Sequence, residues 1–222
     1  MAFLLAMGFC ILAAAAAAST ARANSYGQKS LTQGVDGCCS NPLLGTRVTI
    51  NPQGTWSSSS SQCIEYYSNA NNSDTTKWIQ TGMYRCFQGR TIDGTCPGGL
   101  DSYVEVKPSY GVAPSCTDLG SEGSTTHKYT VDTTSGTTWS AYVDGMVKGS
   151  SLSMGAASKI DETGEFSGDC LVFTSSGQFA FTSPQWQRWT GSTWYTIQSS
   201  DQRIDCGWTI SGSLSSGWTT AH

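Results

Sequence analysis

Short runs in which apolar and polar residues alternate recur along most of the chain. This alternation is typical of half-buried β-strands, because successive side chains of a strand point to opposite faces of its sheet. The runs lie at residues 46–50, 77–84, 102–106, 127–131, 138–143, 169–173, 178–181, 193–197 and 203–210. Turn sequences rich in Gly, Ser and Thr separate them, and no run has helical spacing. The pattern predicts an all-β protein, an antiparallel β-sandwich of jelly-roll or concanavalin-like type.

The N-terminus has the pattern of a secretory signal. Residues 1–18 are almost entirely apolar, and Ala21-Arg22-Ala23 fits a signal-peptidase site of the A-x-A type. This apolar stretch is shorter than the roughly 20 residues that a membrane-spanning helix needs, and no later stretch is longer. We therefore expect a signal peptide at residues 1–23 and no membrane span. The expected product is secreted to the extracellular space as a single β-sandwich domain of residues 24–222.

The cysteines fit an oxidising compartment. Removal of the signal peptide removes Cys10 and leaves an even number of cysteines, which predicts up to four disulfides that staple the sandwich. The candidates are Cys38, Cys39, Cys63, Cys86, Cys96, Cys116, Cys170 and Cys206. Cys86 and Cys96 flank a short loop that a bond between them would close. There is no C-x-x-C pair and His127 is the only internal histidine, so no metal site is expected.

Charge narrows the set of partners. The chain has 12 basic and 16 acidic residues, and without Arg22 the formal charge is 11 − 16 = −5. No basic run is present, so nucleic acid and anionic membranes are poor partners. We expect a monomer that needs no cofactor.

The strand-like run at residues 77–84 carries an unusual polar group. Alternation places Trp78 and Gln80 on the same face of this strand. An amide beside an indole is either a hydrogen-bonded group inside a core or a positioned group in a cleft. The sequence pattern leaves both readings open.

Carboxylates occupy two further strand-like runs. Glu105 shares a face with Tyr103, and in the run A-S-K-I-D-E alternation places Ile160 and Glu162 on one face and Asp161 on the other. A carboxylate in a partly apolar groove has a raised pKa, which suits general acid–base chemistry. The alternative reading is that these residues face solvent on an ordinary antiparallel sheet.

A serine or cysteine nucleophile is a weaker candidate. Such a nucleophile needs a histidine base within hydrogen-bonding reach. His127 opens a strand-like run, and the sequence contains no G-x-S-x-G motif. Carboxylate chemistry is therefore favoured.

Two motifs carry a resemblance to a known family. I-Q-T-G at residues 79–82, followed by S-Y-V-E-V-K-P at 102–108, resembles the glutamic peptidases (eqolisins) and their concanavalin-like β-sandwich relatives. In that family an L-Q-T-G strand precedes a strand of the type A-W-Y-E-W-Y-P. The strand pair at 127–145 and the run A-S-K-I-D-E at 157–162 also match the family's spacing. The resemblance covers about residues 63–181 and departs from the family in the loop that carries Cys86 and Cys96.

The resemblance implies a function and a site. Gln80 falls on the family's catalytic glutamine and Glu162 on its catalytic glutamate, with Glu165 as an alternative because Gly164 makes the register uncertain. The glutamate would act as general base on a water, and Gln80 would orient that water and stabilise the oxyanion. The residues implied to contact the substrate are Trp78, Tyr103, Glu105 and Tyr66, with Tyr67 an alternative to Tyr66. The expected activity is a secreted, acid-acting endopeptidase whose partner is a polypeptide.

The C-terminal third suggests an alternative. It holds five tryptophans, and exposed aromatic side chains on a β-sandwich can stack on sugars. Trp186 and Trp189 lie three residues apart, so a regular strand would place them on opposite faces and not on one flat platform. The alternative function is a non-catalytic sandwich that binds an extracellular glycan or a protein through its concave face.

Overall fold

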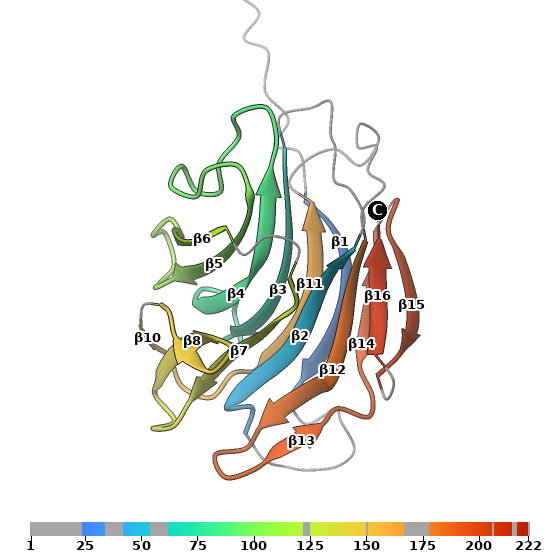
Figure 1. Cartoon of the computed structure of the whole chain (residues 1–222). Helices are drawn as coiled ribbons and strands as arrows, with labels where there is room; N and C mark the ends of the chain where they lie inside the picture. The colour runs from blue at the N-terminus through green and yellow to red at the C-terminus, as the bar shows by residue number, and fades with distance from the viewer. Residues whose placement is uncertain are drawn as a thin grey trace, which may run out of the picture.

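The computed structural model describes residues 24–33, 42–53, 62–121, 125–149, 151–166, 178–205, 207–214 and 217–221. These residues form two antiparallel sheets packed face to face (Figure 1). The first sheet has the strand order β14 (Asp201–Ile204), β1 (Ser25–Thr32), β11 (Lys159–Phe166), β3 (Cys63–Asn71), β4 (Trp78–Cys86), β5 (Leu100–Lys107) and β6 (Ser115–Ser121). The second has the order β10 (Leu152–Ser153), β8 (Thr138–Val143), β7 (His127–Thr133), β2 (Gly45–Gln53), β12 (Gln178–Trp189), β16 (Gly217–Ala221) and β15 (Thr209–Ser213). In addition, β9 (Met146–Val147) pairs with β8, and β13 (Trp194–Thr196) pairs with β12. The predicted all-β sandwich is confirmed.

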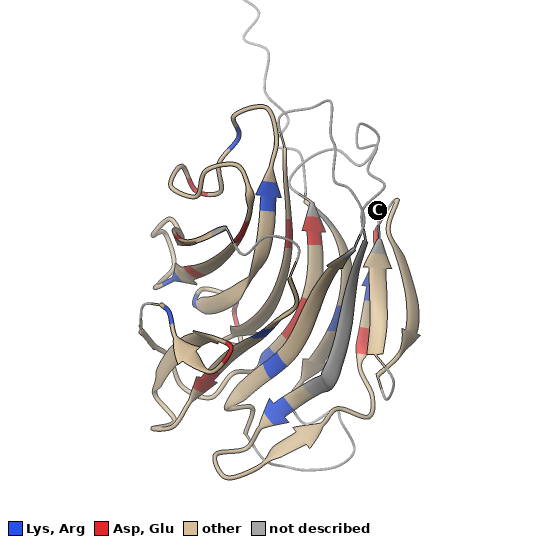
Figure 2. Ribbon diagram, in the orientation of Figure 1, with Lys and Arg blue, Asp and Glu red and all other residues tan. Residues whose placement is uncertain are grey.

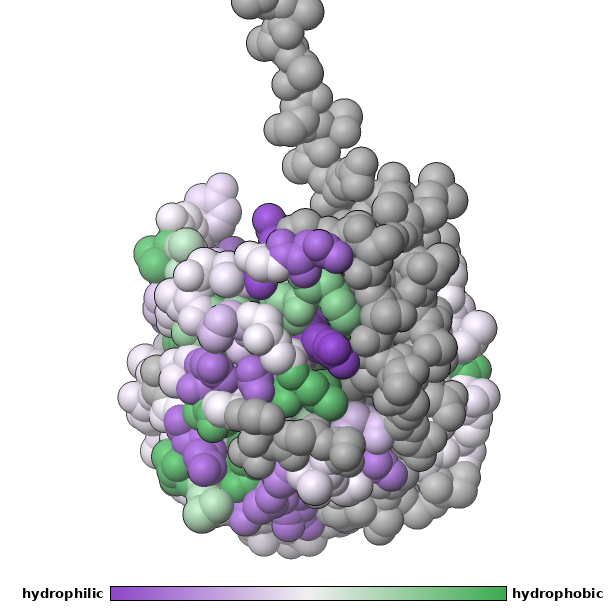
Figure 3. All heavy atoms as spheres, turned by 45° about the horizontal axis from the view of Figure 1, so that its top comes forward, coloured by the Kyte–Doolittle hydropathy of each residue, from purple (hydrophilic) through white to green (hydrophobic). Residues whose placement is uncertain are grey.

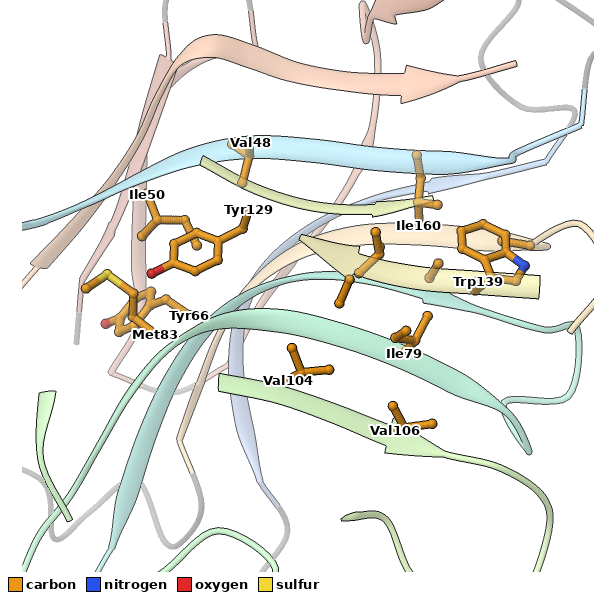
Figure 4. Packing of buried hydrophobic residues seen from close by; sticks show 14 of the residues in the cluster. Val48, Ile50, Tyr66, Ile79, Met83, Val104, Val106, Tyr129, Trp139 and Ile160 are labelled. Atoms are coloured by element: carbon orange, nitrogen blue, oxygen red, sulfur yellow. The ribbon is translucent and has the colours of Figure 1, made fainter. Parts of the chain in front are cut away.

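The core fills the space between the two sheets. Strand alternation sends one face of each strand inward, as in β4, where Ile79 and Met83 are fully buried. Figure 4 shows Met83 close to Ile50 and Tyr129 of the opposite sheet, within the cluster that also holds Ile79. Burial of apolar area of this kind is the main favourable term in folding. Because the inner face of the first sheet is covered by the second sheet, only its outer face is open to bind a ligand.

The ring of Trp208 packs against the first sheet at a position where two neighbouring strands both carry glycine. Gly27 and Gly164 are paired in register, and a Cβ on either would lie within 3 Å of the Trp208 ring. The same indole meets the Tyr66 ring edge-on, with 5.9 Å between ring centroids. These contacts fix the segment that follows β14 against the sheet.

Most of the strand predictions that fall on described residues are confirmed, but one is wrong. Residues 203–210 do not form a continuous strand, because β14 ends at Ile204 and the chain turns through Gly207 with a φ of 80° before β15. The predicted strand at 169–173 and the predicted signal peptide at 1–23 lie outside the described residues. None of the described segments is a helix able to cross a membrane.

The bond that would close the loop between Cys86 and Cys96 is not formed. Cys86 bonds Cys63, its direct neighbour across the β3–β4 pair, and Cys96 bonds Cys116 on β6. Register across strands, and not closeness in sequence, brings these sulfurs together. The other four candidates, Cys38, Cys39, Cys170 and Cys206, lie outside the described residues.

Candidate functional site

The outer face of the first sheet carries an open groove of about 660 Å³. Its floor comes from β3, β4, β5 and β11, and one wall comes from the loop between β4 and β5. Charged and amide side chains dominate the lining, and Figure 2 shows acidic positions along β11. The central lining residues are Glu65, Asn69, Gln80, Glu105, Asp161 and Glu165. A polar groove on one face and an apolar core on the other follow from the alternation in each strand.

Gln80 lies at the centre of a hydrogen-bond cluster. Its side chain is 5% exposed, and its Nε2 lies 2.6 Å from Glu105 Oε2 and 3.0 Å from the Tyr103 hydroxyl. A third acceptor, Glu65 Oε2, is 3.4 Å away. The same oxygen also accepts a hydrogen bond of 2.9 Å from the Tyr103 hydroxyl. The amide is therefore a positioned group in a cleft, the second of the two readings left open by the sequence.

Three glutamates of the groove have raised pKa values. Burial is the largest cause for each of Glu65, Glu105 and Glu165. Repulsion by Glu165 further raises the pKa of Glu65, and a hydrogen bond with Asp93 further raises the pKa of Glu105. Carboxyl groups this close together resist ionising at the same time. These three glutamates therefore stay protonated to higher pH than isolated glutamate side chains do.

Glu165 has the most complete set of donors among these glutamates. Its Oε2 accepts a hydrogen bond of 2.6 Å from the Tyr67 hydroxyl, and its Oε1 accepts one from the side-chain amide of Asn24. Hydrogen bonds from Tyr67, Asn24 and Tyr26 lower the pKa of Glu165 against the raising effect of burial. A negative charge in the cluster is therefore best accommodated on Glu165.

The expected pairing of Gln80 with Glu162 is corrected by the fold. Glu162 points into the space between the sheets and is 0% exposed, with Oε1 accepting from Ser68 at 2.8 Å and from Thr46 at 3.0 Å. Gln80 and Glu162 therefore lie on opposite faces of the same sheet. The alternation in A-S-K-I-D-E groups Glu162 with Ile160, and Ile160 is a core residue. This pattern already indicated that Glu162 faces the core. Glu165, on the other side of Gly164, is the glutamate that shares the groove with Gln80.

The residues expected to contact a substrate divide into two groups. Trp78 and Glu105 line the groove, and Tyr103 lies beneath Gln80 with its hydroxyl in the cluster. Tyr66 does not fit, because it is 0% exposed and packs against Trp208 in the core. Its neighbour Tyr67 lines the groove instead.

Two acidic residues of the groove, Glu65 and Asp93, were missed by the sequence reasoning, and a third, Asp161, was placed on its strand face but not assigned to the site. Asp161 accepts from Asn69 at 3.2 Å, from Asn71 at 3.3 Å and from Thr163 at 2.7 Å. Glu65 stands in C-I-E-Y-Y, where alternation with Tyr67 was an available signal, whereas Asp93 lies in a loop and had none. Basic side chains also line the groove: Lys159, Arg90 and Arg203.

His127 has a hydroxyl and a carboxylate as partners but lies elsewhere. Its Nε2 is 2.7 Å from Thr125 Oγ1, and its Nδ1 is 2.6 Å from Asp144 Oδ2. Asp144 also accepts from the Lys128 backbone N–H at 2.8 Å, so the three side chains tie the end of the β7–β8 hairpin. The residues that line the groove do not include them.

The described tryptophans of the C-terminal third do not form a flat platform. Trp208 and Trp218 are buried, and Trp189 packs on Trp194 at 5.3 Å with the rings tilted by 34°. The Arg47 guanidinium covers Trp194 at 4.2 Å, while the side chain of Trp186 lies outside the described parts. On the face drawn in Figure 3, hydrophobic residues form separate patches among hydrophilic ones. Within the described ranges, His, Cys, Asp and Glu form no group of three or more able to hold a metal ion.

Comparisons with solved structures identify relatives of the fold. Scytalido-glutamic peptidase, solved with a transition state analog inhibitor, matches with a TM-score of 0.59 and 15% identity over 90% of this chain and 98% of that chain. SCP-B, a member of the eqolisin family solved with the tripeptide Ala-Ile-His, matches with a TM-score of 0.53 and 15% identity over 89% of this chain and 96% of that chain. No protein-family model matches the sequence, and no curated protein sequence matches it. The resemblance expected from the motifs is thus found in the fold over nearly the whole chain.

Proposed function

We propose that the chain is a secreted endopeptidase of the glutamic type that acts in acid solution on polypeptides. The observation that carries this proposal is the amide of Gln80, fixed in an open groove that also holds the buried Glu65 and Glu105 and the half-buried Glu165. The similarity of the fold to scytalido-glutamic peptidase and SCP-B supports it. The two disulfides are of the kind that persists in oxidising compartments, which supports secretion.

Glu165 is the proposed general base. As a carboxylate stabilised by Tyr67 and Asn24, it takes a proton from a water whose oxygen forms a bond to the scissile carbonyl carbon. When the C–N bond of the resulting intermediate breaks, Glu165 returns the proton to the leaving nitrogen. Water is thus divided between the two products, and the carboxylate is regenerated.

Gln80 is the proposed oxyanion donor. One hydrogen of Nε2 is held by Glu105 at 2.6 Å, and the other is shared between Tyr103 at 3.0 Å and Glu65 at 3.4 Å. The second hydrogen is the more weakly held and can turn to the oxygen of the tetrahedral intermediate. A preorganised donor of this kind can supply a large share of the rate enhancement.

The cluster also predicts a pH profile. The groove glutamates titrate as one coupled unit, since each ionisation opposes the next. Of the three glutamates, only Glu165 is charged in the proposed active form, so the rate should rise with the first ionisation among them and fall with the second. We expect a bell-shaped pH profile.

The test is cleavage of a denatured protein substrate by purified protein between pH 2 and 7, with pepstatin present to suppress aspartic peptidases. Glu165→Gln and Gln80→Ala should each lower kcat/KM by about 100-fold or more. Glu162→Gln is the matched control and should keep its activity, because Glu162 lies on the core face and a glutamine oxygen can still accept from Ser68 and Thr46.

The outcomes separate the alternatives. Loss of activity in Glu162→Gln but not in Glu165→Gln would restore the pairing expected from the motifs. If folded protein cleaves nothing at any pH, the peptidase proposal fails. The remaining reading is then a sandwich that binds glycan or protein, which a glycan array would examine.

A further inference from the structure

The cleavage site expected from the sequence lies next to the groove. The A-x-A sequence ends at Ala23, so removal of residues 1–23 would make Asn24 the first residue of the chain. Asn24 directly precedes β1, and it lines the groove. Tyr26, two residues later, lines the groove as well, as expected for positions that share one face of a strand. Cleavage would therefore create a new chain end inside the proposed site.

Backbone contacts hold this end of β1 in place. Tyr26 pairs in register with Glu165 on β11. The Tyr26 N–H donates to Asp205 Oδ2 at 3.0 Å, and the Tyr26 carbonyl accepts from the Asp205 N–H at 2.8 Å. The first residues of a chain are poorly ordered unless contacts of this kind tie them down. Asn24 is therefore held at the groove by a neighbouring segment that is bonded on both sides.

Asn24 contacts the proposed base directly. Its side-chain Nδ2 donates to Glu165 Oε1 at 2.5 Å. The α-nitrogen of the same residue is separated from Nδ2 by four covalent bonds, a span of about 5 Å at most. The α-nitrogen therefore lies within roughly 7.5 Å of Glu165 Oε1. This distance is shorter than the length of about 8 Å over which physiological salt screens a charge.

The groove offers Glu165 no other close cation among the described residues. None of the basic side chains that line the groove forms an ion pair with Glu165. Lys159 Nζ lies 3.9 Å from Asp161 Oδ2, and Arg203 is paired with Asp205 at 2.8 Å. A positive charge at the α-nitrogen of Asn24 would thus be the cation nearest to the proposed base that is not already paired.

We propose that removal of residues 1–23 turns the Asn24 nitrogen into an ammonium group of the groove, which faces Glu165 and favours its carboxylate form. A signal peptidase hydrolyses the Ala23–Asn24 bond, so the C–N bond breaks and the oxygen of water joins the Ala23 carbonyl carbon to give a carboxylate. Both hydrogens of the water go to the Asn24 nitrogen. Maturation thus replaces a neutral peptide nitrogen by a cation. The placement of this cation stands on the position of Asn24, and only its consequence for catalysis rests on the proposed function.

The other groups around Glu165 act in both directions on its ionisation. The titratable and charged groups that face it are Glu65 and Tyr67 from β3, Tyr26 from β1 and Asp161 from β11, with Arg203 of β14 placed 4.3 Å over the Tyr26 ring. Burial and the charge of Asp161 raise the pKa of Glu165, whereas hydrogen bonds from Tyr67, Asn24 and Tyr26 lower it. The ammonium group acts in the same direction as these hydrogen bonds.

The first arm of the test reads the charge without reading activity. The precursor is secreted from a host that removes signal peptides, and the intact mass of the product should correspond to a chain that begins at Asn24. The pKa of the α-amino group is then measured by NMR on protein that carries ¹³C-labelled asparagine, as wild type and as Glu165→Gln. The wild-type value should be higher by about half a pH unit or more, because a neighbouring carboxylate favours the ammonium form.

Asp201→Asn is the matched control for this arm. It removes an exposed carboxylate that pairs with Ser30 at the far end of β1, and it should leave the α-amino pKa at the wild-type value. Equal values in wild type and Glu165→Gln would overturn the proposal. A secreted chain that begins at a residue other than Asn24 would overturn it as well.

The second arm reads catalysis with two changes at the chain end. A Gly-Ser dipeptide added before Asn24 moves the ammonium group by about 7 Å along the chain, and acetylation of the Asn24 nitrogen removes its charge in place. Each change should move the acid limb of the pH profile upward by about half a pH unit or more, because Glu165 then ionises only at higher pH. A shift in the extended chain alone would assign the effect to the added residues and overturn the proposal. Absence of cleavage by wild-type protein would instead overturn the proposed function, and the α-amino titration would still decide whether the ammonium group faces Glu165.

Discussion

At Gly82, β4 passes so close to β3 that no side chain fits. A Cβ at this position would lie 1.9 Å from the Tyr66 carbonyl oxygen and 2.6 Å from the Tyr67 Cα, both of them backbone atoms. The glycine of I-Q-T-G therefore allows the strand that carries Gln80 to pack against the strand that carries Glu65 and Tyr67. The motif thus places Gln80 two residues before the glycine that lets its strand approach β3.

We expect Gly82→Ala to lower the free energy of unfolding by about 2 to 3 kcal/mol, since an added methyl group would push two paired strands apart. Urea denaturation followed by tryptophan fluorescence measures this change. Gly155→Ala is the control, because a Cβ there meets nothing within 4 Å. It should change stability by less than about 0.5 kcal/mol. Equal denaturation midpoints for the two variants would contradict the close approach at Gly82.

At the scale of elements, the two described disulfides have different roles although they close loops of similar length. Cys63–Cys86 joins residues that the β3–β4 ladder already pairs, whereas Cys96–Cys116 holds the loop that carries Asp93. Removing either bond by a double alanine substitution should lower the free energy of unfolding by about 3 kcal/mol, because the unfolded chain gains the freedom of a loop of about 20 residues. Urea denaturation of the two double variants and the wild type measures the loss, and a loss below about 1 kcal/mol in either variant would contradict it.

The β-strands were the part of the structure that the sequence could predict. Alternation predicted β4, β5, β7 and β8, and it grouped Trp78 with Gln80 and Ile160 with Glu162, because both patterns are local. Alternation cannot say which face of a strand the second sheet covers, and for this reason the resemblance led to Glu162 although Glu165 shares the groove with Gln80. Disulfide partners and the place of Asp93 in the groove lining depend on cross-strand register and loop conformation, which no single segment contains.

Considered as a whole molecule, the first sheet carries buried carboxyl groups on both of its faces. Glu65 and Glu105 are buried on the groove side beside the half-buried Glu165, and Glu162 is buried on the core side, where its Oε2 has no hydrogen-bond partner among the described residues. Burial raises the pKa of Glu162 well above its ordinary value of 4.5, against the lowering effect of Ser68 and Thr46. These groups favour the neutral form in the folded chain and ionise more readily in the unfolded chain. The sandwich is therefore suited to acid solution on grounds of stability as well as of the proposed chemistry.

The direction of the pH dependence follows from this difference. Because the folded-state pKa of Glu162 lies above the unfolded value, its contribution to stability is fully present below about pH 4.5 and is lost as the pH rises toward the folded-state pKa. The unfolding free energy of the wild type should thus be lower at pH 7 than at pH 4. Glu162→Gln removes the ionisation and keeps the oxygen that accepts from Ser68 and Thr46. At pH 7 the variant should be more stable than the wild type by at least about 1 kcal/mol, the equivalent of less than one unit of pKa difference. At pH 4 the two should agree within about 1 kcal/mol, since each then places a neutral group in the core. Urea denaturation at the two pH values measures both differences, and equal pH dependence in variant and wild type would show that ionisation of Glu162 does not limit the fold at neutral pH.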